Sequence, residues 1–371
     1  MRVHLVDPPA YTPPYDHALA AALARAGAEV ELFTGPFAYG DVPREPGYVV
    51  RERFYRWAPR RARRAARLAQ HVPGMLAYRA AARSADVVHW QWLAVQQLDA
   101  ALLPRVRPQV LTAHDVLPRE AGPRRRAAQA RLYARMDAVV VHSEHGAARL
   151  RDEAGVDPAR IHVIAHGAFA HLARAEPGAA LPPELAGPRR GPVTLCFGLV
   201  RPYKGIYVLL DAWRALGAEV PGELWIVGMP RMDVAALRAA SPPSVRWVPR
   251  FVTGDELAAT FRAADLAVLP YREIDQSGVL FTALAFGLPL LLSRVGGFGE
   301  LASTGAAALV EPGDPAALAE VLRALLADPA RLAAMAAAAR AAAAPGGPYG
   351  WDGIARRHLA LYAGLLGARQ A

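Results

Sequence analysis

The stretch "VTLCFGLVRPYKGIYVLLDAWRALG", residues 193–217, joins two different hydrophobic patterns at one short turn. Residues 193–197 form an apolar run of strand length, whereas residues 205–217 carry apolar side chains at helical spacing. Gly198 and Gly205 bracket the turn, where glycine permits tight backbone conformations. A buried strand that leads through such a turn into a helix is typical of a βαβ unit and predicts a parallel sheet.

Short apolar strands alternate with helices on both sides of this turn. The alternation is lost in "RAEPGAALPPELAGPRRGP", where proline and glycine dominate. We therefore predict an α/β protein with two doubly wound, Rossmann-like domains whose parallel sheets face each other across a ligand cleft. The expected parts are a first domain at residues 1–173, a linker at 174–192, a second domain at 193–348 and a final helix at 349–371.

Length and composition agree with this organisation. A chain of 371 residues suits two cores, and an apolar fraction of 53% is typical of a globular protein. Cys196 is the single cysteine, which excludes an intrachain disulfide. The sequence has no long signal-peptide core and no apolar run of about 18 residues, so we expect a cytoplasmic protein, with the inner membrane face as an alternative. In the first helix we expect Asp16 to be the N-cap and Gly27 to end the helix.

Positive charge gathers in the first half of the chain. Residues 1–175 hold 25 Arg against 16 Asp and Glu, whereas residues 176–371 have a net charge of only +1. The densest segment, residues 51–70, interleaves arginine with Phe54, Tyr55 and Trp57. Such a segment fits a solvated helix face, a peripheral contact with an anionic membrane, or nucleic acid. We expect no nucleic-acid partner.

Two cations lie in the turn between residues 198 and 205. Lys204 is the only lysine among 43 basic residues, and Arg201 precedes it by three positions. Lysine supplies a compact point charge where arginine would impose a planar fork of greater reach. At the carboxyl end of a parallel strand these cations would meet a diphosphate together with helix amides. A fixed cation there would also stabilise a departing diphosphate.

A second strand–loop–helix unit occupies residues 271–301, "YREIDQSGVLFTALAFGLPLLLSRVGGFGEL". Ser277 is a candidate N-cap for the apolar helix that follows. The backbone amides of Gly278 and Val279 would then point toward an anion.

These segments together resemble the retaining nucleotide-sugar glycosyltransferases of family 4 (group 1), which have the GT-B architecture. "FGLVRPYKGIYVLLDAW", "ELWIVG", "RFVTGDELAATFRAADLAVLPY" and "ALAFGLPLLLSRVGGFGEL" resemble the donor-binding domain of that family. "GAEVELFTG", "HSEHGAARL" and "IHVIAHGAF" resemble its first domain, which binds the acceptor. The closing "WDGIARRHLALY" resembles the helix that crosses back to the first domain.

The resemblance implies roles for individual residues. It assigns catalytic roles to His114, near the transferred sugar, and to Arg201 and Lys204, on the donor diphosphate. The residues implied in donor binding are Gly198, Phe251, Val252, Glu273, Asp275, Gln276, Ser277, Gly278, Val279 and Thr282, with Phe251 and Val252 near the base. Gly296, Gly297 and Glu300 would shape the cleft.

The chain departs from the family pattern at several positions. Leu199 stands where the family commonly has an arginine, so Arg201 is expected to substitute. Ile274 and Thr282 stand where two glutamates are frequent, and "PPAYTPPYDH" replaces the N-terminal Gly-Gly loop. The chain has no D-x-D motif, which predicts a reaction without a metal ion and with no cofactor beyond the nucleotide-sugar co-substrate.

Two aromatic features of the first domain have alternative readings. Asp115 either orients the His114 ring or caps a helix. Trp90 and Trp92 either pack in the core or flank an acceptor pocket.

The function predicted is therefore a retaining hexosyltransferase that moves a sugar from a UDP- or GDP-sugar to an acceptor. The acceptor would be a small molecule, a glycan or a lipid-linked sugar. The alternative is a non-catalytic nucleotide-sugar-binding partner subunit, which the two missing glutamates motivate. A basic membrane-binding or nucleic-acid-binding protein that only carries the fold is a third hypothesis.

Overall fold

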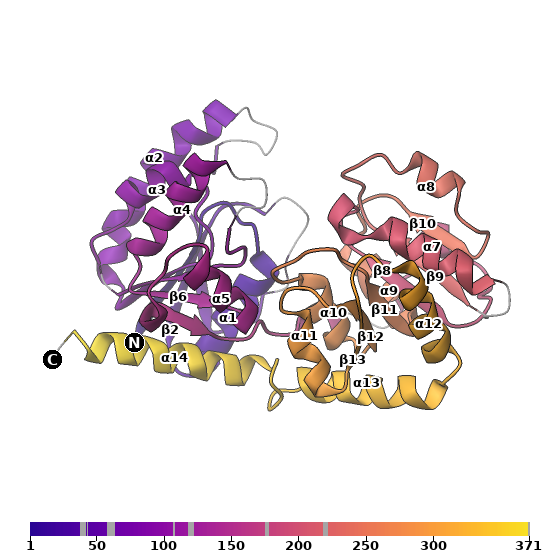
Figure 1. The fold of residues 1–371 in the computed structure, drawn as a ribbon. Coiled ribbons are helices and arrows are strands. Elements are labelled where there is room, and N and C mark those ends of the chain that lie inside the picture. The colour runs from indigo at the N-terminus through magenta and orange to yellow at the C-terminus, as the bar shows by residue number, and fades with distance from the viewer. Residues whose placement is uncertain are drawn as a thin grey trace. The chain divides into compact units, whose positions relative to one another are not determined.

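The computed structural model describes residues 1–37, 42, 44–57, 64–106, 108–117, 122–174, 178–217 and 222–369. The contacts within the chain divide it into two compact units. One unit comprises Met1–Gly167 together with Pro348–Ala371, and the other comprises Ala168–Gly347. Each unit is a parallel sheet with helices packed on its faces (Figure 1).

The sheet of the first unit has the order β3-β2-β1-β4-β5-β6-β7, and each neighbouring pair is parallel. Its strands are β1 (Arg2–Asp7), β2 (Glu29–Thr34), β3 (Tyr48–Glu52), β4 (Val87–Trp90), β5 (Gln109–Thr112), β6 (Ala138–Val141) and β7 (Ile161–Val163). Its helices are α1 (Pro13–Arg25), α2 (Arg64–Ala81), α3 (Gln96–Leu102), α4 (Pro123–Ala134), α5 (Glu144–Asp152) and α14 (Trp351–Gly367). The central strands β4, β5 and β6 are buried along their whole length, as expected for a parallel sheet covered on both faces, whereas the edge strands β3 and β7 are not.

The sheet of the second unit has the order β10-β9-β8-β11-β12-β13 and is also parallel. Its strands are β8 (Val193–Phe197), β9 (Glu223–Val227), β10 (Val245–Val248), β11 (Leu266–Leu269), β12 (Leu290–Ser293) and β13 (Ala307–Val310). Its helices are α6 (Ala170–Ala173), α7 (Ile206–Leu216), α8 (Ala235–Ala239), α9 (Gly254–Ala263), α10 (Gly278–Ala285), α11 (Phe298–Leu301), α12 (Pro315–Leu326) and α13 (Pro329–Ala343). Counted within the unit, this is the Rossmann strand order 3-2-1-4-5-6.

The last helix, α14, belongs to the first unit, where it packs against α1. Its Tyr362 is fully buried, and the Tyr362 hydroxyl lies 2.6 Å from Nδ1 of His89 on β4. Trp351, at the start of α14, lies so close to Gly167 that a Cβ on the glycine would come within 2.2 Å of the indole. Through these contacts the C-terminal helix α14 packs against the first unit, whose sheet is formed by the N-terminal part of the chain.

The segment predicted as a linker is divided differently by the structure. Residues 168–192 fall in the second unit, apart from 175–177, which lie outside the described residues. Arg246 on β10 donates hydrogen bonds to the carbonyl oxygens of Ala186 and Pro188, at 3.2 and 2.9 Å. The proline-rich segment is therefore held on the edge of the second sheet.

The expected N-cap of α1 is wrong. The helix begins at Pro13 with Thr12 in the N-cap position, and Asp16 lies in the first turn with 1% of its surface exposed. Proline is favoured in the first helical turn because its missing N–H needs no partner there. Gly27 follows the helix at φ +96°, so the expected helix end is confirmed.

The basic segment 51–70 is only partly a surface feature. Residues 58–63 lie outside the described residues. Phe54 and Tyr55 are buried in the core of the first unit, whereas the Trp57 side chain is 82% exposed. Two of the three aromatic residues are therefore core residues, because they follow β3 directly. Among the described residues, no helix combines the length and hydrophobicity needed to cross a bilayer.

Candidate functional site

The strand order of the second unit reverses between β8 and β11. In open parallel sheets, ligands bind beyond the carboxyl ends of the strands at such a switch point. The turn that carries Arg201 and Lys204 follows β8, and the loop that carries Gln276 and Ser277 follows β11. The topology therefore brings the two predicted anion-binding segments to one edge of the sheet.

These two loops are in direct contact. The backbone N–H of Arg272 donates to the carbonyl oxygen of Tyr203 at 2.7 Å. Gly205 adopts φ +65°, and a Cβ there would lie 2.0 Å from the carbonyl oxygen of Pro270. Only glycine allows this approach, which explains why the turn needs a glycine after the lysine.

Lys204 is enclosed between the two loops, with 6% of its surface exposed. Its Nζ lies 5.0 Å from the centroid of the Tyr271 ring, within the range of a cation–π contact. A Cβ on Gly198 would lie 2.7 Å from this Nζ and 3.1 Å from Cγ2 of Val279. The ammonium therefore lies beside a bare stretch of backbone and near the first turn of α10.

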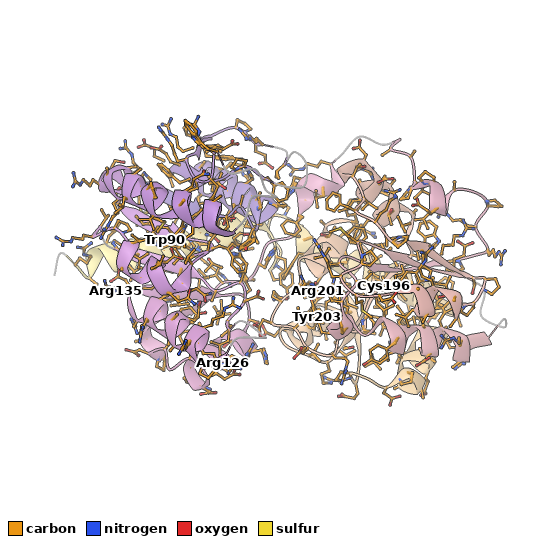
Figure 2. The ribbon with its side chains drawn as sticks, turned by 90° about the horizontal axis from the view of Figure 1, so that it is seen from above. Trp90, Arg126, Arg135, Cys196, Arg201 and Tyr203 are labelled. Carbon is orange, nitrogen blue, oxygen red and sulfur yellow. The ribbon has the colours of Figure 1, made fainter. Side chains whose placement is uncertain are left out.

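Arg201 supplies a second cation to the same turn. It is exposed and precedes the short helical turn Pro202–Lys204. Figure 2 shows Arg201 and Tyr203 in the same loop, while Cys196 lies on the adjoining strand β8. One buried lysine and one exposed arginine thus lie in the turn that follows β8.

Helix α10 begins at Gly278, as the sequence predicted. The predicted N-cap position of Ser277 is confirmed, although its side chain makes no capping hydrogen bond. The Ser277 hydroxyl lies instead 3.5 Å from the Tyr271 hydroxyl. The first N–H groups of a helix have no partner within the helix, so those of Gly278 and Val279 suit an anion.

The other expected donor residues of this loop differ in exposure. Glu273 is exposed and Asp275 is buried. Gln276 accepts a hydrogen bond from the Ser277 N–H at 3.3 Å. The buried Thr282 hydroxyl donates to the Gly278 carbonyl oxygen at 3.0 Å, so this side chain stabilises the first turn of α10.

A third loop, after β12, closes on the same region. Gly296 adopts φ +53°, and a Cβ there would lie 1.8 Å from the carbonyl oxygen of Ile274. The Gly297 N–H donates to the carbonyl oxygen of Asp275 at 3.2 Å. Glu300 in α11 is exposed. The two glycines therefore set the shape of this edge of the unit by allowing close backbone contact.

The expected base-binding residues follow β10. The Phe251 side chain is 47% exposed, whereas Val252 is buried. The preceding residue, Arg250, forms ion pairs with Glu184 and Glu256, with N–O distances of 2.8 and 2.7 Å. These pairs fix the loop and leave the Phe251 ring on the surface.

Sequence reasoning missed one contact in this unit. Gly228 follows β9 at φ +145°, and a Cβ there would lie 2.1 Å from the carbonyl oxygen of Gly198. The signal was a glycine directly after a buried strand in "ELWIVG". Gly228 allows the loop after β9 to touch the turn that leads to Lys204.

In the first unit, His114 follows β5 and lies in a group of aromatic rings. Its ring stacks on Trp92 at a centroid distance of 5.4 Å and an interplanar angle of 13°. Tyr15 contacts the ring edge-on at 4.8 Å, and His142 lies at 5.1 Å. Among the described residues, no group of three or more His, Cys, Asp or Glu side chains is arranged to hold a metal ion.

Hydrogen bonds determine which nitrogens of these histidines carry protons. His142 Nδ1 lies 3.0 Å from the Ile164 carbonyl oxygen, which only accepts, so Nδ1 must be protonated. Burial lowers the pKa of His142 to about 4, so its Nε2 is a bare acceptor at neutral pH. His114 Nδ1, at 3.2 Å, therefore donates to it.

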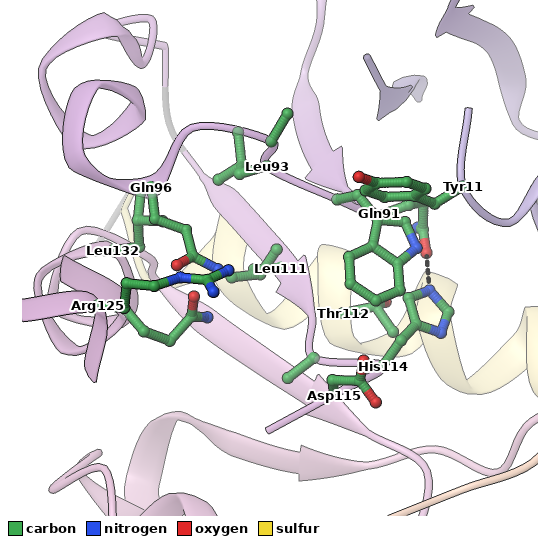
Figure 3. Close-up of a pocket in the computed structure, with 14 residues that line it drawn as sticks. Tyr11, Gln91, Leu93, Gln96, Leu111, Thr112, His114, Asp115, Arg125 and Leu132 are labelled. Carbon is green, nitrogen blue, oxygen red and sulfur yellow. Dashed lines mark hydrogen bonds between the residues drawn. The ribbon is translucent and has the colours of Figure 1, made fainter. Parts of the chain in front are cut away.

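His114 is then a neutral imidazole with an unprotonated Nε2. Burial, and then the neighbouring His142, hold the pKa of His114 well below 6.5. Its Nε2 lies 3.1 Å from the Gln91 side-chain amide (Figure 3). Because both ring nitrogens face Gln91 and His142, Asp115 does not orient this ring. Asp115 is not a helix N-cap either, since α4 begins at Pro123 with Gly122 as its cap.

A pocket of about 180 Å³ opens beside His114 at the carboxyl ends of β4 and β5 (Figure 3). It is lined by Tyr11, Gln91, Trp92, Leu93, Ala94, Gln96, Leu111, Thr112, Ala113, His114, Asp115, Arg125, Gln129 and Leu132. Trp92 thus lines a pocket, whereas Trp90 is fully buried in the core. Core packing is therefore confirmed for Trp90, while an acceptor pocket beside Trp92 stays a prediction.

A buried pair of carboxyl groups holds the loop that forms one wall of this pocket. Asp7 and Asp16 are 0% and 1% exposed, and burial raises the pKa of both. Asp7 Oδ2 accepts from the N–H groups of Tyr11 and Thr12 at 2.7 and 3.2 Å. The Thr12 hydroxyl in turn accepts from the indole N–H of Trp92 at 2.9 Å. The loop that replaces a Gly-Gly sequence is therefore anchored by aspartate.

Two parallel Rossmann-like sheets define the class of this protein, which has the GT-B architecture of glycosyltransferases. The fold matches sucrose-phosphate synthase from Thermosynechococcus elongatus at a TM-score of 0.75, with 22% identity over 99% of this chain and 100% of the other. It also matches Anabaena Alr3699/HepE in complex with UDP-glucose at a TM-score of 0.70, with 19% identity over 98% of this chain and 100% of the other.

The sequence places the chain within that class. Residues 15–168 match the model of Glycosyltransferase Family 4, and residues 191–328 match that of Glycosyl transferases group 1. The chain is 31% identical to D-inositol 3-phosphate glycosyltransferase 1 of Catenulispora acidiphila, over 92% of this chain and 88% of the relative. The chain belongs to the group 1, family 4 glycosyltransferases, as its resemblance implied.

Proposed function

We propose that this glycosyltransferase moves a hexose from a UDP- or GDP-sugar to a hydroxyl group of an acceptor, with retention and without a metal ion. The bond between the anomeric carbon and the diphosphate oxygen breaks, and the anomeric carbon forms a new bond to the acceptor oxygen. The acceptor hydroxyl loses its proton, and the nucleoside diphosphate leaves with the bonding electron pair. The observation that carries the proposal is the enclosed Lys204 ammonium beside the start of α10.

The positive charge of this region fits a departing diphosphate. Lys204 supplies a fixed ammonium, Arg201 an exposed guanidinium, and α10 the N–H groups of Gly278 and Val279 at its start. Charges that are already in place when the leaving group develops its own charge lower the barrier most. We propose that Lys204 and Arg201 contact the diphosphate through its oxygens, with Gly198 leaving room for it.

The remaining donor residues divide by chemistry. Phe251, with its exposed ring, and Val252 would contact the base. Glu273, Asp275 and Gln276 would bind hydroxyl groups of the sugar or ribose in place of the two absent glutamates. Gly296, Gly297 and Glu300 would shape the same edge, and Thr282 would contribute by holding the first turn of α10.

His114 is proposed to contact the transferred sugar. Its Nδ1 faces His142 and its Nε2 faces the Gln91 amide, so the contact would be made by the rest of the ring and not by a hydrogen bond to either ring nitrogen. Its low pKa makes it a poor proton acceptor at neutral pH, so a positioning role fits better than a role as general base.

The solved Alr3699/HepE complex, which shares this fold, contains UDP-glucose. This similarity favours a UDP-sugar as the donor. The relative from Catenulispora acidiphila is named for D-inositol 3-phosphate, which makes a phosphorylated cyclitol one acceptor to test. The alternative function, a non-catalytic partner subunit, retains donor binding but carries out no transfer.

We also propose a peripheral contact with anionic membranes through the first unit. Trp57 is 82% exposed, and Leu68 and Leu76 of α2 are 43% and 47% exposed. An exposed tryptophan near arginines is typical of a protein surface that lies against lipid headgroups.

The proposed function is tested by incubating the purified protein with UDP- and GDP-sugars and a panel of hydroxylated acceptors. Transfer is measured as glycosylated product and as released UDP or GDP. Product with the anomeric configuration of the donor is expected, in the presence of a chelator. Donor binding without product across the panel would instead favour the partner subunit.

A further inference from the structure

A buried aromatic residue, Tyr271, lies next to Lys204 at the carboxyl end of β11. It follows Pro270, and 1% of its surface is exposed. Its ring meets the Tyr203 ring edge-on, at a centroid distance of 6.0 Å and an interplanar angle of 89°. The buried Phe298 ring of α11 contacts it at 5.4 Å. The ring is therefore packed between the turn after β8 and the helix after β12.

The backbone on both sides of Tyr271 is also fixed. On one side, the Pro270 carbonyl oxygen lies 2.0 Å from the Cβ position of Gly205. On the other side, the Arg272 N–H donates to the Tyr203 carbonyl oxygen at 2.7 Å. These two contacts hold the aromatic residue in a defined position relative to the turn that carries the lysine.

The face of the Tyr271 ring is directed at the Lys204 ammonium. The Nζ atom lies over the ring, 5.0 Å from its centroid. Only 6% of the Lys204 surface is exposed, so little water reaches this contact. Burial disfavours an ammonium ion, and the attraction to a ring face offsets part of that cost most effectively where water is excluded.

An aromatic ring stabilises an ammonium without neutralising it. A carboxylate would hold the same cation more strongly, but its negative charge would repel the phosphate oxygens of a nucleotide. The Tyr271 ring has no net charge, so the Lys204 ammonium keeps its attraction for an anion. The contact therefore suits a cation that must be fixed in place and must still bind a diphosphate.

The hydroxyl group of the same side chain lies near the start of α10. The Tyr271 hydroxyl is 3.5 Å from the hydroxyl of Ser277, which is in the N-cap position. Cγ2 of Val279 and Nζ of Lys204 lie 3.1 and 2.7 Å from the Cβ position of Gly198. Tyr271 thus adjoins both parts of the predicted anion site, the ammonium through its ring face and the helix start through its hydroxyl group.

We propose that Tyr271 is a positioning residue for the donor diphosphate, and that its ring face holds the Lys204 ammonium beside the start of α10 without cancelling its charge. Tyr271 acts through Lys204 and does not itself touch the substrate. This role rests on the proposed function, because it is defined by the binding of a nucleoside diphosphate.

The single lysine of the chain allows the position of the ammonium to be measured directly. Protein labelled with [ε-¹³C]lysine gives one lysine signal, that of Lys204. Protons over the face of an aromatic ring resonate upfield of their position in an unstructured peptide. We expect an upfield lysine methylene signal in the wild type and in Tyr271→Phe, and a signal close to the unstructured value in Tyr271→Leu.

The second readout is the affinity for UDP and GDP, measured by calorimetry. Tyr271→Phe keeps the ring, so its affinity is expected to stay within about threefold of the wild type. Tyr271→Leu is expected to weaken binding about tenfold, which is the effect of losing a desolvated cation–π contact. With a donor and an acceptor, kcat/KM is expected to fall in the same order.

The matched control is Phe261→Leu, which removes another fully buried ring from the second unit. Phe261 contacts Phe197 and Phe286, at 4.9 and 5.3 Å. Its replacement is expected to lower the melting temperature, as Tyr271→Leu does, because both create a cavity in the core. The lysine signal and the nucleotide affinity of Phe261→Leu are expected to remain those of the wild type.

A fluorinated ring covers the case in which Tyr271→Leu fails to fold. A ring-trifluorinated phenylalanine at position 271 nearly keeps the size of the ring and withdraws electron density from its face. This protein is expected to bind UDP or GDP more weakly than Tyr271→Phe at a similar melting temperature, since a cation–π contact depends on the negative face of the ring.

Three results would overturn the proposal. The first is an identical lysine signal in the wild type and in a folded Tyr271→Leu variant. The second is that Tyr271→Phe loses as much affinity as Tyr271→Leu, since the ring would then contribute nothing. The third is that the fluorinated ring binds nucleotide as tightly as Tyr271→Phe, or more tightly.

The outcome for the proposed function is read separately. Sugar transfer with no effect of Tyr271 would overturn the positioning role and leave the proposed function standing. Nucleotide binding that depends on the Tyr271 ring, without transfer to any acceptor, would contradict the proposed function and leave the positioning of the ammonium standing. A wild type that binds neither UDP nor GDP would contradict both.

Discussion

The Lys204 ammonium lies 2.7 Å from the point that a Cβ would occupy on Gly198. Gly198 itself adopts φ +104°, so the turn combines an unusual backbone conformation with a cation packed against it. We expect Gly198→Ala to displace the ammonium and to weaken binding of UDP or GDP at least tenfold by calorimetry.

Gly198→Ala would also strain the backbone, so a control variant is needed that introduces the strain without displacing the ammonium. Gly313 adopts φ +81° and has no atom within 4 Å of its Cβ position. Gly313→Ala is therefore expected to lose about 1–2 kcal/mol of stability from the left-handed conformation and to bind nucleotide normally. Equal nucleotide affinity in both variants would show that Gly198 serves only the backbone.

A second prediction concerns the carboxyl pair Asp7–Asp16. Oδ1 of Asp7 and Oδ2 of Asp16 are buried and have no hydrogen-bond partner among the described residues. One proton shared between the two carboxyl groups would give both oxygens a partner. Asn at position 16 would donate to Asp7 as a protonated carboxyl does, so Asp16→Asn should change the free energy of unfolding by less than about 0.5 kcal/mol. Asp7→Asn should cost about 2–3 kcal/mol, because it weakens charge-assisted bonds from Tyr11 and Thr12.

The measurement is chemical denaturation, with amide exchange at Tyr11 and Thr12 as the local readout. Asp152→Asn is the control, since the Asp152 side chain is 59% exposed in the same unit. Equal destabilisation by Asp16→Asn and Asp7→Asn would show that both carboxyl groups are charged and that no proton is shared.

The carboxyl pair is a feature that the sequence did not predict. Asp16 follows two prolines and was interpreted as an N-cap, because capping is the common role of aspartate before an apolar helix. Its burial depends on Asp7 at the end of β1, and no local pattern gives that contact. The strands, the glycine turns and the start of α10 were predictable because each follows from a short-range pattern.

The candidate site residues also include some that the sequence predicted and others that it did not. Lys204 stood out in the sequence because it is the only lysine, and its turn follows a recognisable strand. Tyr271 had no such signal, because a ring that packs against a buried ammonium is recognised only once its surroundings are known. The partners of His114 were likewise hidden, since His142 lies on a different strand–helix connection.

A third prediction concerns acid stability. Burial lowers the pKa of His358 to about 3, against about 6.5 in the unfolded chain. The folded state is therefore favoured fully above pH 6.5, and this contribution is lost as the pH falls toward 3. Between pH 6.5 and 4.5 the loss amounts to about 2 kcal/mol for this one residue.

His358→Leu is expected to flatten that pH dependence without lowering stability at pH 7. Both ring nitrogens of His358 lack a hydrogen-bond partner among the described residues, so leucine removes only unpaired polar atoms. Melting temperatures between pH 4.5 and 7.5 give the measurement, with the exposed His145→Leu as control. An unchanged slope in His358→Leu would mean that the pKa of His358 is the same in the folded and the unfolded protein.

A fourth prediction concerns the proposed membrane contact. Trp57→Ser is expected to reduce pelleting with vesicles of anionic phospholipid several-fold, because it removes the most exposed large hydrophobic side chain among the described residues. Tyr207→Ser, which removes a 38% exposed ring from the second unit, should have no effect. Equal pelleting of Trp57→Ser and wild type would place the membrane contact elsewhere or exclude it.

The central claim is that Lys204 stabilises the diphosphate of a nucleotide-sugar donor. The most direct measurement compares sugar transfer by the wild type, Lys204→Ala and Lys204→Arg, with the fold of each variant checked by its melting temperature. Lys204→Ala is predicted to lower kcat/KM at least 100-fold, and Lys204→Arg nearly as much, because a planar guanidinium does not fit between Tyr271 and Gly198. Near wild-type transfer by a folded Lys204→Ala variant would contradict the account.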